Sequence, residues 1–135
     1  MNAMEKVAWT ELAVSVTTVI VVASLVPWLG QGAVGAFGLL GLLGLCGLYT
    51  RRRGHQVVVD ERDIEIQRSA TALGFGTAWM TLYGTLLAAT LWAAYNHVDT
   101  VSIWFLNWLI WLQFALVYGI KGLVAIILYR RRHAS

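Results

Sequence analysis

Four long runs of apolar residues constrain this chain most, because few folds can cover them. The runs span residues of about 7–29, 33–49, 71–95 and 101–129. Of the 135 residues, 59% are hydrophobic and 13% charged, whereas soluble domains carry about 25% charged residues. A transmembrane helix needs about 20 apolar residues. The sequence therefore predicts an all-α, polytopic membrane protein, a single membrane domain over residues 1–135 built as a four-transmembrane-helix bundle.

Positive charge predicts how this bundle is oriented. The two tight connections, residues 30–32 and 96–100, contain no Lys or Arg, whereas nine of the ten basic residues flank the other ends of the runs. By the positive-inside rule, both termini and the loop of residues 50–70 are cytoplasmic. The formal net charge of +3 fits anionic lipid headgroups better than nucleic acid, because the basic residues sit at the ends of apolar runs. The predicted partner is therefore the lipid bilayer, with no nucleic acid.

Glycine recurs at every third position from Gly32, just before the second run, to Gly47 within it. Three residues advance an α-helix by 300°, so this stripe is predicted to wind around the helix axis. Small residues let neighbouring helices approach closely in lipid. We expect packing within the bundle or in a homo-oligomer, with a helix that bends during transport as the alternative. The predicted packing residues are Gly35, Gly38, Gly41, Gly44 and Gly84.

Several polar side chains interrupt the apolar runs. Glu11, Ser15 and Thr18 follow helical spacing, so this polar stripe is expected to face protein. On the fourth run, Asn107 and Lys121 fall near a common line with Trp111, Phe114 and Tyr118. A charge at membrane depth costs about 3 kcal/mol, so Lys121 needs a structural or functional reason.

Three interpretations of Lys121 stay open. It could pair with Glu11, which approaches from the same cytoplasmic side, although helical side chains lean towards the helix N-terminus and would lean apart here. It could reach the headgroups or a backbone carbonyl. Finally, Glu11, Asn107 and Lys121 could form a transport site for an ion or a proton. Glu11 is similar in position to the membrane glutamate of small multidrug resistance transporters, with no further likeness.

The loop between the second and third runs carries a cluster of charges. Asp60 is suited to cap a helix start, and Glu61 and Asp63 complement the helix dipole in its first turn. The third helix is therefore predicted to run from about Glu61 to Tyr95.

The sequence Asp60, Glu61, Arg62, Asp63, followed by Ile66 and a transmembrane run, resembles the motif of small four-pass prokaryotic membrane proteins of unknown function. This resemblance covers residues 60–75 and the pattern of four spans. It implies the architecture, a prokaryotic cytoplasmic (inner) membrane and no particular activity. Members of this family are thought to accompany small transcriptional regulators, which would make the motif a cytoplasmic docking surface.

The same acidic residues have two other interpretations. They could pair with the neighbouring arginines, or bind a divalent cation, although their spacing does not match a calcium loop. The three histidines are scattered and Cys46 is the only cysteine, so the sequence predicts no metal site and no cofactor. Paired acids or a Ser/His pair at membrane depth are also missing from the pattern, so we expect no enzyme.

Two functional hypotheses follow. The first is a non-enzymatic bundle that assembles with itself or with another membrane protein through its glycine grooves. The alternative is a small oligomeric transporter or channel that uses Glu11 and Lys121, with the aromatic line of the fourth run along its path.

Overall fold

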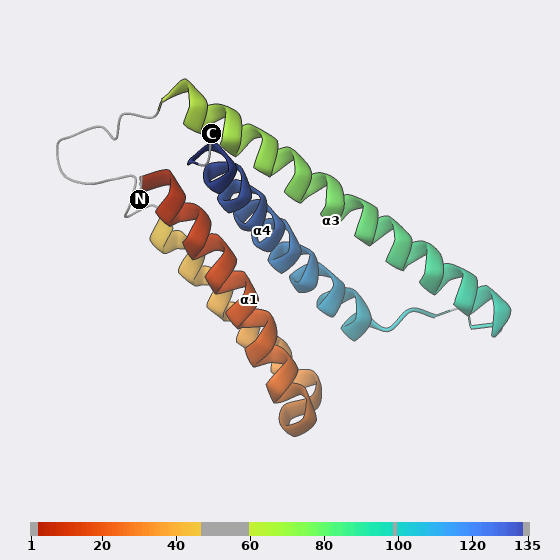
Figure 1. The fold of residues 1–135 in the computed structure, drawn as a ribbon. Helices are drawn as coiled ribbons and strands as arrows, with labels where there is room; N and C mark the ends of the chain where they lie inside the picture. The colour runs from red at the N-terminus through yellow and green to blue at the C-terminus, as the bar shows by residue number, and fades with distance from the viewer. Residues whose placement is uncertain (1–2, 47–59, 99, 134–135) are drawn as a thin grey trace.

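The computed structural model describes residues 3–46, 60–98 and 100–133. The elements, in chain order, are α1 (Ala3–Leu29), the 3-10 helix η1 (Gly30–Leu45), α3 (Glu61–Tyr95) and α4 (Ile103–His133). Helix α4 packs against both α1 and α3, and η1 runs back alongside α1 (Figure 1). The fold is therefore all-α over the described ranges, with α4 as its central helix.

Three segments of the described chain are long and apolar enough to cross a membrane, namely Ala3–Leu45, Glu61–Tyr95 and Ile103–Arg131. These lengths and compositions suit a membrane protein. The prediction of a four-transmembrane-helix bundle is wrong, because the described residues provide three such helices and not four. The second predicted span, residues 33–49, forms a 3-10 helix as far as Leu45 and belongs to the first segment.

The glycine repeat explains this difference. A 3-10 helix has 3.0 residues per turn, so side chains at positions i and i+3 eclipse each other. Glycine at every third position removes this crowding along one row, whereas each glycine would cost about 1 kcal/mol relative to alanine in an α-helix. The turn into η1 is made by Gly30, whose φ of +52° favours glycine.

The glycine row therefore lies along one side of η1 and does not wind around it. Phe37 and Leu40 of a second row are buried against α1 and α4. A Cβ atom built at Gly35, Gly38, Gly41 or Gly44 would meet no atom within 4 Å among the described residues. These four glycines therefore make no close contact with another described helix. Gly47 lies outside the described residues.

Two other glycines allow the closest helix approaches. A Cβ at Gly122 of α4 would lie 2.7 Å from the Ala8 carbonyl oxygen and 2.8 Å from the Leu12 nitrogen of α1. A Cβ at Gly74 of α3 would lie 2.8 Å from the Val117 carbonyl oxygen of α4. Backbone atoms cannot move aside as a flexible side chain can. Glycine is therefore required where α1 and α3 each touch α4.

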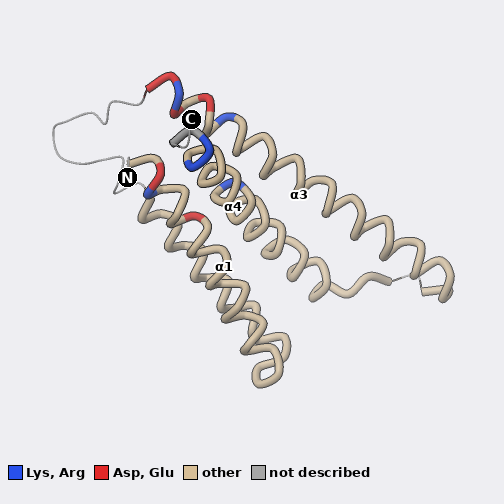
Figure 2. Tube along the Cα trace, viewed as in Figure 1, with Lys and Arg blue, Asp and Glu red and all other residues tan. Residues whose placement is uncertain are grey.

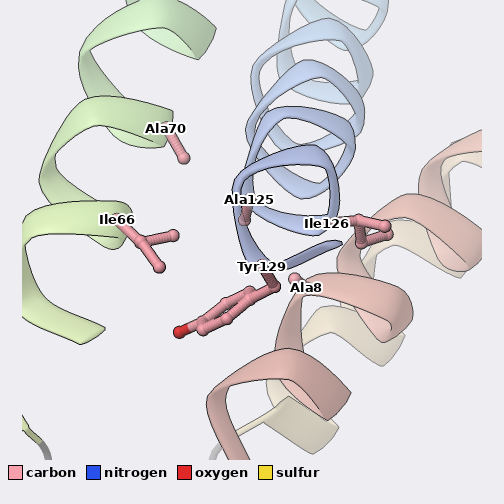
Figure 3. Close-up of a cluster of buried hydrophobic side chains, with 6 residues drawn as sticks. All are labelled: Ala8, Ile66, Ala70, Ala125, Ile126 and Tyr129. Carbon is pink, nitrogen blue, oxygen red and sulfur yellow. The ribbon is translucent and has the colours of Figure 1, made fainter. Parts of the chain in front are cut away.

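One end of the molecule holds a compact apolar cluster, shown in Figure 3. It joins the start of α1, the start of α3 and the end of α4, and its buried members are Ala8, Ile66, Ala70, Ala125, Ile126 and Tyr129. On α1, the polar stripe of Glu11, Ser15 and Thr18 is buried, which confirms that it faces protein.

Charged residues gather at this same end of the helices (Figure 2). Helix α3 begins at Glu61 and ends at Tyr95, as predicted, with Asp60 at the N-cap. The Asp60 side chain makes no capping hydrogen bond, and the backbone carbonyl of Asp60 accepts from the Asp63 and Ile64 amides instead.

Substitution of Gly122 tests the close approach of α1 and α4. Gly122→Ala should lower the free energy of unfolding by about 1–3 kcal/mol, because the added methyl group meets α1 backbone. The measurement is denaturant unfolding in detergent micelles. Gly84→Ala is the matched control, since a Cβ there meets nothing within 4 Å, and it should leave stability unchanged or raise it by up to about 1 kcal/mol. Equal stability of the two variants would contradict the packing described here.

Candidate functional site

Glu11 and Lys121 form a direct ion pair between α1 and α4. The Lys121 ammonium group donates a hydrogen bond to Glu11 Oε1 at 2.6 Å. The side chains of Lys121 and Glu11 are 17% and 5% exposed, respectively. Of the three interpretations left open by the sequence, the structure therefore shows direct pairing.

The close approach at Gly122 makes this contact possible. Gly122 follows Lys121 directly, and the backbone at Ala8 and Leu12 next to Gly122 brackets Glu11 on α1. The two helices are consequently near enough for the side chains to meet although each leans towards its own N-terminus.

The second carboxylate oxygen of Glu11, Oε2, takes no part in the ion pair. Oε2 is buried and has no hydrogen-bond partner among the described residues. Glu11 also lines a groove of about 560 Å³ between η1 and α4. A buried, unpaired carboxylate oxygen costs free energy, so a donor from elsewhere is expected to satisfy it.

Aromatic rings of α4 form one wall of this groove, which we call the glycine groove. The wall consists of Trp111, Phe114 and Tyr118, and the opposite wall includes Gly38, Gly41 and Gly44. Phe37 of η1 stacks on Trp111 with ring centroids 6.1 Å apart. The ring centroids of Phe114 and Tyr118 are 5.0 Å apart. The Lys121 ammonium lies 5.8 Å from the Tyr118 ring centre, within the range of a cation–π contact.

The third residue of the predicted transport site lies elsewhere. Asn107 lines a separate hollow with Trp104 and Ile110. Fourteen residues separate it from Lys121, which is about 21 Å along a helix. The structure thus brings Glu11 and Lys121 together and leaves Asn107 apart.

The charged motif at the start of α3 divides into two parts. Asp60, Glu61 and Arg62 are exposed, whereas Asp63 is buried at 4% exposure. The Tyr129 hydroxyl of α4 donates a hydrogen bond to Asp63 Oδ1 at 2.8 Å, and Figure 3 shows this ring directed from α4 towards α3. Asp63 therefore joins two helices, whereas Asp60, Glu61 and Arg62 lie on the surface.

Two residues that join helices, Tyr129 and Gln113, are not among those predicted from the sequence. Tyr129 lies seven positions after Gly122, so helical spacing could have placed it on the same face of α4. Gln113 donates to the Ala78 carbonyl of α3 at 2.6 Å, a contact that periodicity alone does not reveal. Within the described ranges, no group of three or more His, Cys, Asp or Glu side chains could hold a metal ion.

Comparisons with protein families, curated proteins and solved structures found no match to this chain. The resemblance of residues 60–75 to a family of small membrane proteins accordingly stays a prediction.

A double-mutant cycle tests the ion pair. Glu11→Gln or Lys121→Met alone should lower the free energy of unfolding by about 3–5 kcal/mol, because each leaves its partner buried without its counter-charge. The double variant should recover most of this loss. Unfolding in detergent micelles, followed by circular dichroism, measures all four proteins. Additive losses would show that the two groups do not interact.

The Asp63–Tyr129 hydrogen bond has its own test. Tyr129→Phe should lower the free energy of unfolding by about 1.5–3 kcal/mol, as expected for a buried hydrogen bond to a charged group. Tyr95→Phe is the matched control, because Tyr95 is 86% exposed, and the same unfolding measurement should show no change. A Tyr129 variant as stable as this control would contradict the contact.

Proposed function

We propose that this chain is a non-enzymatic, multi-pass protein of a prokaryotic cytoplasmic membrane that works by binding a transmembrane helix of a second copy. The supporting observation is a groove of about 750 Å³ over α4, bounded by α1 and α3. We call it the α1–α3 groove. Its walls are almost entirely apolar and include Val16 and Ile20 of α1, Thr85 of α3 and Leu112 of α4.

A polar atom in this groove favours a helix over lipid chains. Ser15 lines the groove and is 2% exposed, and its Oγ has no hydrogen-bond partner among the residues described. The hydroxyl groups of Thr81 and Thr85 instead bond to carbonyls of their own helix. Lipid chains contain no hydrogen-bond partner for the Ser15 hydroxyl, whereas an approaching helix can supply one.

The alternative of a transporter or channel has less support. The ion pair of Glu11 and Lys121 lies at membrane depth, as a transport site would require, but its two charges balance each other. Asn107 lies in a separate hollow. A continuous polar path would require further groups between them.

The distribution of charge supports the proposed orientation. Arg62 and Arg68 lie near the start of α3, and Arg130 lies near the end of α4. Figure 2 shows Lys and Arg gathered where these two helix ends meet. By the positive-inside rule, this end faces the cytoplasm. The exposed Asp60, Glu61 and Arg62 would then be presented to cytoplasmic partners.

Filling the α1–α3 groove tests the proposed assembly. Thr85→Trp places a large ring in the groove and should weaken self-association by about tenfold or more, which is about 1.4 kcal/mol. Sedimentation equilibrium in detergent, repeated by energy transfer in liposomes, measures the association constant.

The matched control is Leu87→Trp, which adds the same ring two residues away at a position that is 60% exposed and outside this groove. It should associate like the unmodified protein. A chain that is monomeric in both media, or that responds equally to the two substitutions, would refute self-assembly through this groove.

A further inference from the structure

The glycine groove lies on the η1 side of α4 and plays no part in the assembly proposed above. It combines three observations: a volume of about 560 Å³, an aromatic wall facing a row of glycines, and Glu11, which is 4% exposed. Ligand sites in proteins are commonly apolar cavities of about 300–1,000 Å³ with a few placed polar groups. The groove has these properties.

Glu11 Oε2 defines the polar group that an occupant must offer. This oxygen is buried and lacks a hydrogen-bond partner within the described parts of the chain, while Oε1 accepts from Lys121. A carboxylate oxygen accepts hydrogen bonds and donates none. The occupant must therefore carry a donor.

The ion pair defines the charge of the occupant. The Glu11 carboxylate is already balanced by the Lys121 ammonium 2.6 Å away. A cationic ligand would leave a net positive charge at membrane depth, and an anionic ligand would face Oε2 without a donor, both of which are unfavourable in a low dielectric. A neutral donor such as a hydroxyl group avoids both costs.

The walls of the groove suit an occupant whose remaining part is apolar. Trp111 and Phe114 offer apolar ring surface, and Gly38 and Gly41 offer a wall without side chains. A Cβ at either glycine would meet nothing within 4 Å, so this space is open next to the rings. An extended hydrocarbon chain can lie along such a wall with its head at Glu11.

We propose that the glycine groove binds a neutral lipid with a free hydroxyl group, whose hydroxyl donates to Glu11 Oε2 and whose chain lies between η1 and the aromatic rings of α4. This site is separate from the α1–α3 groove and requires no second copy.

Photolabelling tests the site. The protein, in phosphatidylcholine nanodiscs, is irradiated with a diazirine derivative of hexadecanol, and the labelled peptides are identified by mass spectrometry. We expect labelling of residues around the groove, with octadecanol competing about tenfold better than octadecyl methyl ether, which lacks the donor. Octadecylamine should compete less well than octadecanol because of its charge. Equal competition by the ether, stronger competition by the amine, or labelling spread evenly over all lipid-facing surfaces would overturn the proposal.

Two glycine variants locate the site. Gly41→Leu fills the groove and should lower specific labelling by about tenfold, whereas Gly35→Leu, on the same row but outside the groove, should leave it unchanged. Circular dichroism checks folding of both, and the comparison of alcohol with ether in the unmodified protein stands if a variant does not fold. Gly41→Leu should keep the association constant of the unmodified chain, so failure of this site and failure of self-assembly are distinguishable. Unchanged labelling of Gly41→Leu would overturn the proposed location.

Discussion

The close approach of α1 and α4 at Gly122 is the constraint on which the rest of the structure depends. A single methyl group there would lie 2.7 Å from backbone of α1, so the two helices touch through their main chains. Lipid provides no hydrophobic drive for helix association, and such contact between backbones is a main source of packing energy in membranes. The same contact sets the distance between Glu11 and Lys121, whose charges are stable at this depth only as a pair.

Several elements of the fold could be predicted from the sequence because their cause is local. The start of α3 fits the acidic Glu61 and Asp63 of its first turn, although the Asp60 side chain makes no capping hydrogen bond. Its end at Tyr95 precedes the polar residues Asn96 and His97. Likewise, the spacing of Glu11, Ser15 and Thr18 places all three on one side of α1, and this side is buried. In each case, a pattern within one element is enough.

The remaining features depend on a choice of helix geometry or on contacts between helices. With 3.6 residues per turn, the glycine repeat predicts a winding stripe and a fourth transmembrane α-helix. With 3.0 residues per turn, it gives the row observed on η1. The Glu11–Lys121 contact depends on how closely α1 and α4 pack, and the tilt of isolated side chains argued against it. The partner of Asp63, Tyr129, is 66 residues away in the chain, a distance over which sequence spacing predicts nothing.

Helix α1 presents two buried polar groups to two different grooves. Glu11 lines the glycine groove and Ser15, one turn later, lines the α1–α3 groove, and each has an oxygen without a hydrogen-bond partner in the described chain. In water, such atoms would be satisfied by solvent, but hydrocarbon offers no donor or acceptor, so an unsatisfied group carries its full cost there. A carboxylate accepts only, whereas a hydroxyl both donates and accepts. The two grooves therefore call for different occupants: a neutral donor beside Glu11, and beside Ser15 a helix whose polar groups can exchange hydrogen bonds with it.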